Sequence, residues 1–144
     1  MVAKNFNIDG QKNYNDVFPF SVRSCVGLDN LNFLIDWIED HRELILDRTH
    51  NHGAFLLRGF PVDGEHDFEK VIKTFRLENL SYDNTLSNAI RKNVTERVFT
   101  ANEAPKEVKI HLHHELAQTP MPPTHLFFYC KNKPNVGGET PICR

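Results

Sequence analysis

Residues 109–144 have the sequence KIHLHHELAQTPMPPTHLFFYCKNKPNVGGETPICR, and this stretch decides which fold and which site we expect. His113 and Glu115 stand two positions apart, so in an extended segment both side chains leave the same face of the backbone. The aromatic run Leu126–Cys130 and a Gly-Gly-Glu-Thr-Pro turn at residues 137–141 follow them. The stretch therefore contains an imidazole and a carboxylate that can converge on one cation. It also has the residue pattern of a strand followed by a turn.

One imidazole and one carboxylate make an incomplete set of metal ligands. In a facial triad of two His and one carboxylate, a second imidazole completes the set and open positions remain on Fe(II) for a cosubstrate and dioxygen. His111 and His114 raise the local density of imidazoles, and on a strand His111 would share the face of His113 and Glu115. The residues alone leave two interpretations open, a metal-binding edge and a solvated polar edge on which histidines also gather.

Signals in the surrounding backbone predict strands that are joined by turns. His125–Cys130 is expected to be a strand because of its aromatic content, with Cys130 buried in it as a small hydrophobe. The prolines within residues 120–123 force a loop before this strand. The two glycines of residues 134–138 can take the positive φ of a turn after it. Arg97–Thr100 is predicted to form a further strand.

A long helix is predicted in the first third of the chain, because apolar residues recur there at helical spacing. These residues are Leu31, Leu34, Ile35, Ile38 and Ile45. Asp29 or Asn30 can cap the N-terminus of the helix, and Gly53 is expected to end it. The short apolar run Ala54–Leu57 that follows is typical of a buried strand.

A second helix is predicted for Glu65–Arg76, which has one apolar face. The residues on that face are Phe68, Val71, Ile72 and Phe75. Residues 1–28 form a polar lead-in whose Phe18–Phe20 we expect to lie extended on the core, and residues 77–92 are expected to be a polar loop. Two helices with strands around them predict an α+β fold, and 144 residues suit a single domain.

The composition excludes several classes of protein. Hydrophobic residues make up 40% and charged residues 25% of the chain, as in globular proteins and unlike disordered ones. The sequence contains neither an apolar run of the roughly 20 residues that span a bilayer nor the apolar region of a secretory signal, so we expect a cytoplasmic protein. The 17 basic and 19 acidic residues are interspersed, without the basic stripe that a nucleic-acid partner requires.

The cysteines bear on the choice of metal. They are Cys25, Cys130 and Cys143. Their number is odd and they form no C-x-x-C pair, so we expect reduced thiols. Structural zinc usually recruits thiolates, which argues against it here. A zinc-binding structural domain built on His111, His113 and Glu115 nevertheless stays open as an alternative.

Several segments, taken in order, resemble the taurine dioxygenase and clavaminate synthase-like family of Fe(II)- and 2-oxoglutarate-dependent oxygenases. They are Phe55–Phe60, Phe99–Glu103, His113–Gln118, Leu126–Cys130 and Gly137–Ile142. A lone His-x-Glu would arise often by chance, but the joint occurrence of these segments in this order is specific. The resemblance covers roughly residues 18–144.

The resemblance implies a set of site residues and cofactors. It makes His113 and Glu115 the first two iron ligands, where many relatives have Asp in place of Glu. It places the hydroxyl of Thr140 against a carboxylate of 2-oxoglutarate, although a Thr that simply fills a strand is the alternative. It also implies dioxygen and a small-molecule substrate. Three residues near the ligands could face that substrate or have plain loop roles. They are Asn102, Lys109 and Gln118.

The family's distal His and its Arg that clamps 2-oxoglutarate lie far downstream of the first two ligands. His125 comes only ten residues after Glu115, so we do not assign it as that His, and His111 and His114 match no ligand position. We therefore expect residues 1–144 to be the N-terminal part of a double-stranded β-helix, or jelly-roll, oxygenase core with flanking helices. Such a chain should be inactive by itself. A non-catalytic relative that acts as an interaction module is the alternative.

Overall fold

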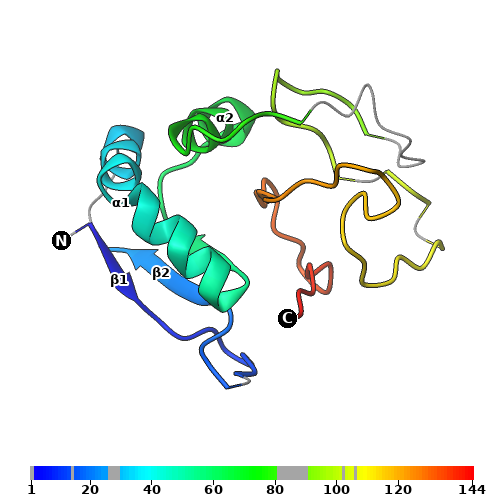
Figure 1. The fold of residues 1–144 in the computed structure, drawn as a ribbon, viewed down its shortest axis with the longest axis horizontal. Coiled ribbons are helices and arrows are strands. Elements are labelled where there is room, and N and C mark those ends of the chain that lie inside the picture. The colour runs from blue at the N-terminus through cyan, green and yellow to red at the C-terminus, as the bar shows by residue number, and fades with distance from the viewer. Residues whose placement is uncertain (1, 14, 26–29, 81–90, 102, 106) are drawn as a thin grey trace.

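All helices and strands of the described chain lie within its first 74 residues. The computed structural model describes residues 2–13, 15–25, 30–80, 91–101, 103–105 and 107–144. The elements are β1 (Ala3–Asn5), β2 (Phe20–Ser24), α1 (Leu31–His52), β3 (Phe55–Arg58) and α2 (Gly64–Thr74). Figure 1 shows the sheet and helices on one side of the molecule and the later, irregular part of the chain on the other. The α+β class predicted from the sequence is confirmed.

The three strands form one mixed sheet in the order β1-β2-β3. Val22 of the central strand pairs antiparallel with Asn5 and parallel with Leu57. The parallel pair β2 and β3 needs a long crossover, and α1 with its 22 residues supplies it. The predicted lead-in at residues 1–28 therefore contributes two of the three strands. Phe18 is buried and Phe20 begins β2, which confirms that this part of the chain lies extended on the core.

The ends of α1 agree with the sequence signals. The side chain of Asn30 accepts a hydrogen bond from the backbone N–H of Asn32 at 2.9 Å and so caps the N-terminus. Gly53 follows the last turn with φ 78°, a left-handed conformation that costs glycine little. A Cβ atom at Gly53 would lie 3.4 Å from the ring of Phe18. The chain can therefore reverse directly into β3.

The core lies between the two helices and β3. Its buried residues are Leu34, Ile38, Ile45, Val71 and Phe75. Phe55 and Leu57 of β3 pack against this cluster, so the strand predicted after Gly53 is confirmed, with its apolar residues partly rather than fully buried. The helix predicted for Glu65–Arg76 is α2, which ends at Thr74 because Arg76 already has a left-handed φ of 56°. Neither helix of the described chain combines the length and apolar character needed to cross a membrane.

Two strands predicted for the second half are wrong. In place of the strand Arg97–Thr100, the structure has a single isolated bridge between Asn93 and Phe99. His125–Cys130 is in no strand, and Cys130 is exposed rather than buried. A strand needs a neighbouring strand for its backbone groups, and within the described residues no element pairs with this segment. Its aromatic side chains dock on a helix instead.

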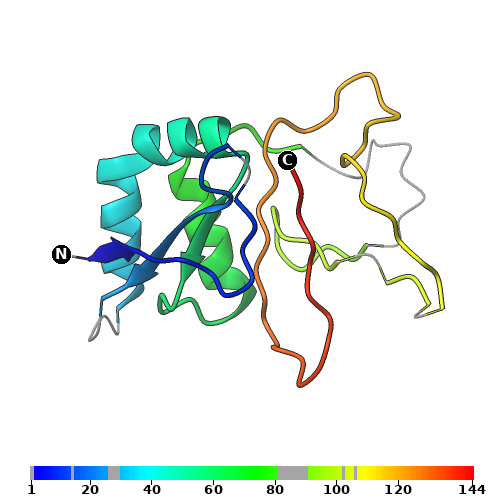
Figure 2. The same cartoon turned by 90° about the horizontal axis from the view of Figure 1, so that it is seen from below.

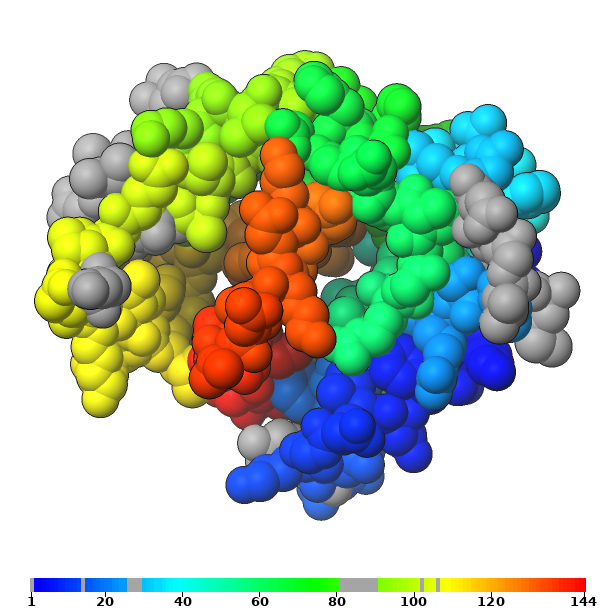
Figure 3. All heavy atoms as spheres, turned by 180° about the vertical axis from the view of Figure 1, so that it is seen from behind, coloured from blue at the N-terminus to red at the C-terminus, as the bar shows by residue number. Residues whose placement is uncertain are grey.

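Residues 127–129 dock on α2 through alternate side chains. The ring of Phe127 lies 5.1 Å from that of Phe75, and the ring of Tyr129 lies 5.3 Å from that of Phe68. Phe128 between them is 71% exposed, as expected of an extended chain with one docked face. In Figure 3 this part of the chain crosses between the helical part and the irregular part, with hollows on either side. Figure 2 shows the same separation from below.

Candidate functional site

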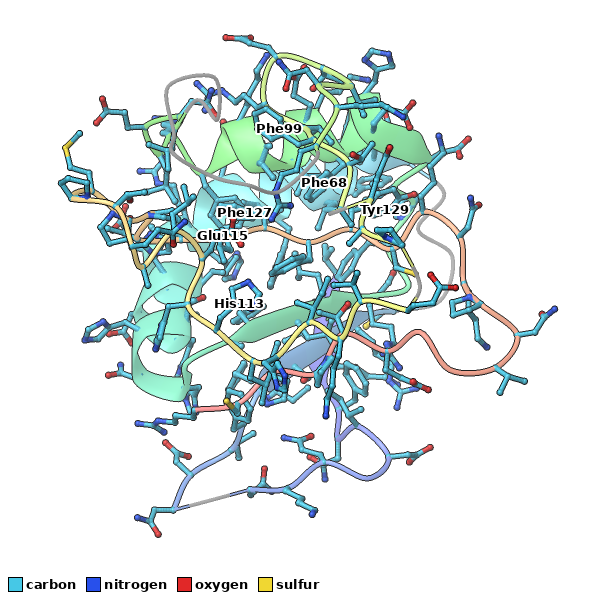
Figure 4. The ribbon with its side chains drawn as sticks, turned by 90° about the vertical axis from the view of Figure 1, so that its right-hand side faces the viewer. Phe68, Phe99, His113, Glu115, Phe127 and Tyr129 are labelled. Atoms are coloured by element: carbon cyan, nitrogen blue, oxygen red, sulfur yellow. The ribbon has the colours of Figure 1, made fainter. Side chains whose placement is uncertain are left out.

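His113 and Glu115 converge, as their spacing predicted. The Nε2 atom of His113 lies 3.8 Å from Oε2 of Glu115. The convergence does not come from a strand, because residues 111–114 are irregular and a turn begins at Glu115. Leu116 in that turn is buried with a left-handed φ of 53°, so its side chain anchors the turn in the interior. Figure 4 shows both candidate ligands leaving the same stretch of backbone.

The backbone fixes the tautomer of the His113 ring. The Nδ1 atom of His113 lies 2.6 Å from the carbonyl oxygen of His111. A carbonyl can only accept a hydrogen bond, so Nδ1 carries the proton in the neutral ring and Nε2 presents its lone pair. A histidine that binds a metal through one ring nitrogen usually donates a hydrogen bond from the other ring nitrogen. His111 therefore contributes its backbone carbonyl to the arrangement.

Glu115 is held by an ion pair that sequence reasoning missed. A guanidinium nitrogen of Arg91 lies 3.1 Å from Oε1 of Glu115, and the exposed fractions of the two side chains are 19% and 13%. Arg91 lies 24 positions earlier in the chain, within the loop predicted for residues 77–92. A basic residue in a polar loop carries no local signal of a distant partner, so the sequence could not have identified this pair.

The pair fits part of a metal site but not a whole one. Two bonds of about 2.0–2.2 Å each can bridge a nitrogen and an oxygen that are this far apart. However, no three His, Cys, Asp or Glu residues of the described chain form a group that could hold a metal ion. The described residues include His111, His113 and Glu115, so the zinc alternative gains no support. One ion could contact both atoms, but the described residues bring no third candidate ligand to the pair.

The neighbouring His114 and the later His125 do not join this arrangement. His114 is exposed beside the pair, and His125 is exposed with its ring nitrogen 3.0 Å from the hydroxyl of Thr124. Neither joins His113 and Glu115 in a group that could hold a metal within the described chain.

The other predicted site residues lie on exposed backbone. Thr140 follows Gly137 and Gly138, which have the predicted positive φ values of 69° and 75°, and the chain bends just before them at residues 135–136. Lys109 and Gln118 are exposed on either side of the candidate ligands. Asn102 lies outside the residues that the structure describes.

A hairpin at residues 92–100 follows Arg91 directly in the chain and contacts α2. Within it, the backbone N–H of Val94 donates to the carbonyl of Val98 at 2.8 Å. Glu69 of α2 accepts hydrogen bonds from the hydroxyl of Thr95 at 2.6 Å and from the backbone N–H of Arg97 at 3.0 Å. These bonds, the one from Thr95 above all, lower the pKa of Glu69. The Glu69 carboxylate is therefore one anchor of the hairpin on the helical part, and the ion pair of Lys73 with Glu96 at 3.0 Å is another.

Comparison with known protein families agrees with the sequence motifs. Residues 20–143 match the model of the family described as "Taurine catabolism dioxygenase TauD, TfdA family". The chain belongs to this family. The match spans β2, β3, both helices and the two candidate ligands, and it confirms the resemblance drawn from the five segments.

Two relatives support membership of the TauD/TfdA family. A clavaminate synthase-like protein of Arabidopsis thaliana is 50% identical over 105 residues, which cover 73% of this chain and 31% of the relative. The dapdiamide synthesis protein DdaC of Enterobacter agglomerans is 32% identical over 90 residues, which cover 62% of this chain and 27% of the relative. The chain thus spans about a third or less of the length of these curated relatives.

Proposed function

We propose that this chain is part of an Fe(II)- and 2-oxoglutarate-dependent dioxygenase that oxidises a small molecule. The observation that carries the proposal is the 3.8 Å approach of His113 Nε2 to Glu115 Oε2 in a chain that matches a dioxygenase family. In this proposal, both residues are ligands of Fe(II). Bound iron would supply the open positions at which 2-oxoglutarate and dioxygen react.

The two side chains are suited to this role before any metal binds. The carbonyl of His111 orients the His113 ring, and Nε2 of that ring lies 3.8 Å from Glu115 Oε2. The Glu115 carboxylate is largely shielded from water, which strengthens its attraction for a cation. Ligands that are already oriented lose less conformational freedom on binding.

We propose that Thr140 binds a carboxylate group of 2-oxoglutarate. A hydroxyl donor to a carboxylate makes a charge-assisted hydrogen bond of roughly 1.5–3 kcal/mol. The exposed backbone after Gly137 and Gly138 leaves the Thr140 side chain accessible to a ligand. Lys109 and Gln118 are proposed to face the substrate, since both are exposed beside the candidate ligands.

We also propose that the third iron ligand and the Arg that clamps 2-oxoglutarate belong to sequence outside residues 1–144. Two observations support this. No three candidate ligands come together within the described chain. The chain also spans only 31% and 27% of its two relatives. The jelly-roll core proposed for the complete domain would then need strands beyond the three seen here.

Anaerobic titration with Fe(II) tests the ligand assignment. The parent chain should bind Fe(II) weakly, and both His113→Ala and Glu115→Ala should bind it much more weakly still. His114→Ala is the matched control, because it removes an exposed imidazole between the two ligands and should leave the affinity unchanged. Equal Fe(II) affinity in the parent and in both ligand variants would show that His113 and Glu115 do not bind the metal.

A further inference from the structure

We propose that Arg91 is a positioning residue for the metal site. Its guanidinium binds Oε1 of Glu115 and so holds the carboxylate with Oε2 toward the metal. The inference rests on the proposed function, because it presumes that Glu115 is a metal ligand.

The two carboxylate oxygens of Glu115 have different neighbours. Oε1 lies 3.1 Å from a guanidinium nitrogen of Arg91. Oε2 lies 3.8 Å from Nε2 of His113, the atom whose lone pair the tautomer makes available. One oxygen is therefore turned toward a fixed cation and the other toward the partner ligand. A metal ion shared with His113 would therefore be bound through Oε2.

Burial makes the contact between Arg91 and Glu115 an effective restraint. Both side chains are less than one fifth exposed, so water and salt screen the pair weakly. A guanidinium stays charged over the pH range in which proteins are folded, so the cation of the pair is not lost by deprotonation. The contact with Arg91 limits the side-chain torsions of Glu115, and the freedom that it removes need not be removed by metal binding.

Arg91 is itself placed by the helical part of the molecule. The hairpin at residues 92–100 begins directly after it, and Glu69 anchors that hairpin to α2 through Thr95 and Arg97. Lys92, the next residue, accepts a hydrogen bond at its carbonyl from the N–H of Thr100 at 3.0 Å. A continuous chain of contacts therefore runs from α2 through the hairpin and Arg91 to the candidate ligand.

Titration with Co(II), followed by its visible absorbance, tests the inference in the purified chain. Arg91→Gln should weaken Co(II) binding about tenfold, the lower end of the effect of residues that orient metal ligands. Arg91→Lys keeps the charge but loses the planar fork, and its affinity should fall between those of Arg91→Gln and the parent. Lys92→Gln removes a neighbouring positive charge that pairs with Glu103, and it should bind as the parent does.

A double-mutant cycle separates positioning from a general structural role. In the Glu115→Ala background, Arg91→Gln should change the remaining Co(II) affinity less than twofold, because the group that Arg91 positions is absent. If Arg91→Gln weakens Co(II) binding as strongly in that background as in the parent, Arg91 acts through the fold and the inference is wrong.

The remaining outcomes are equally decisive. Unchanged or tighter Co(II) binding in Arg91→Gln overturns the inference alone, and tighter binding would mean that Arg91 competes with the metal for Glu115. A parent chain that takes up no Co(II) overturns the proposed function and the inference together. Should Arg91→Gln fail to fold, Arg91→Lys decides, and parent-like affinity in that variant overturns the inference.

Discussion

The ring of Tyr129 is stacked on the ring of Phe68, with the centroids 5.3 Å apart and the planes inclined by 24°. Figure 4 shows the two rings together beside α2. The Tyr129 hydroxyl donates to the carbonyl of Val62 at 3.0 Å and accepts from the N–H of Gly64 at 3.1 Å. One side chain therefore ties the segment that follows the ligand turn to the N-terminus of α2.

Removal of this hydroxyl should destabilise the chain. Tyr129→Phe keeps the stacked ring but leaves the carbonyl of Val62 and the N–H of Gly64 without their partner. We expect the free energy of unfolding to fall by about 1–2 kcal/mol, measured by urea denaturation. The control is Phe128→Leu at the 71% exposed neighbouring position, which should change it by no more than about 0.5 kcal/mol. Equal losses in the two variants would contradict the role of the hydroxyl.

The hairpin anchor gives a second prediction for stability. Glu69→Gln keeps an oxygen that can accept from Thr95 and Arg97 but loses the charge that strengthens both bonds and the ion pair with Lys73 at 3.3 Å. At neutral pH we expect a loss of about 1–2 kcal/mol in the free energy of unfolding. Glu39→Gln is the control, since Glu39 makes one exposed ion pair with Arg76, and it should have little effect.

The effect of Glu69→Gln should depend on pH in a defined direction. The hydrogen bonds from Thr95 and Arg97 lower the pKa of folded Glu69 below its ordinary value of 4.5. The stabilisation by Glu69 is therefore complete above that value and is lost as the pH falls through the lowered pKa. Denaturation curves of parent and variant should differ by a constant amount above pH 4.5 and converge below it. A difference that persists undiminished in acid would contradict this mechanism.

The helical half could be predicted from the sequence because its signals are local. The cap at Asn30, the left-handed Gly53 and the apolar spacing of α1 each act within a few residues, and the structure has all three. The strands expected at Arg97–Thr100 and His125–Cys130 are not formed in the described chain. A strand depends on a distant partner, and residue type alone does not show whether that partner is present.

The candidate site likewise has one part that could be predicted from the sequence and one part that could not. His113 and Glu115 could be found because two residues in one short segment must lie close together wherever that segment goes. Arg91 could not be found, because its contact with Glu115 depends on how the hairpin at residues 92–100 is placed on α2. The role of the His111 carbonyl was also missed, since backbone atoms leave no mark in a residue pattern.

The proposed contact of Thr140 with 2-oxoglutarate predicts a selective loss of affinity. In a longer protein that supplies the third ligand, Thr140→Val should weaken 2-oxoglutarate binding about tenfold or more and leave Fe(II) binding unchanged, because it deletes a hydroxyl donor and keeps the shape. Thr140→Ser, which retains the hydroxyl, should bind nearly as the parent does. Anaerobic titration of each ligand by absorbance measures both affinities. Unaltered 2-oxoglutarate affinity in Thr140→Val would remove Thr140 from the site.

Turnover should separate metal binding from catalysis. Two protein ligands cannot fix the facial geometry that places 2-oxoglutarate and dioxygen side by side, so the purified chain should form negligible succinate from 2-oxoglutarate. Extension by sequence that supplies a third ligand and a clamping Arg should produce iron-dependent succinate formation. That activity should be lost in His113→Ala and Glu115→Ala but largely kept in His125→Ala, since His125 is exposed and contacts Thr124. If the purified chain instead turns over robustly with iron, and His125→Ala abolishes this activity, then the third ligand lies within residues 1–144 and our assignment of the ligand set is wrong.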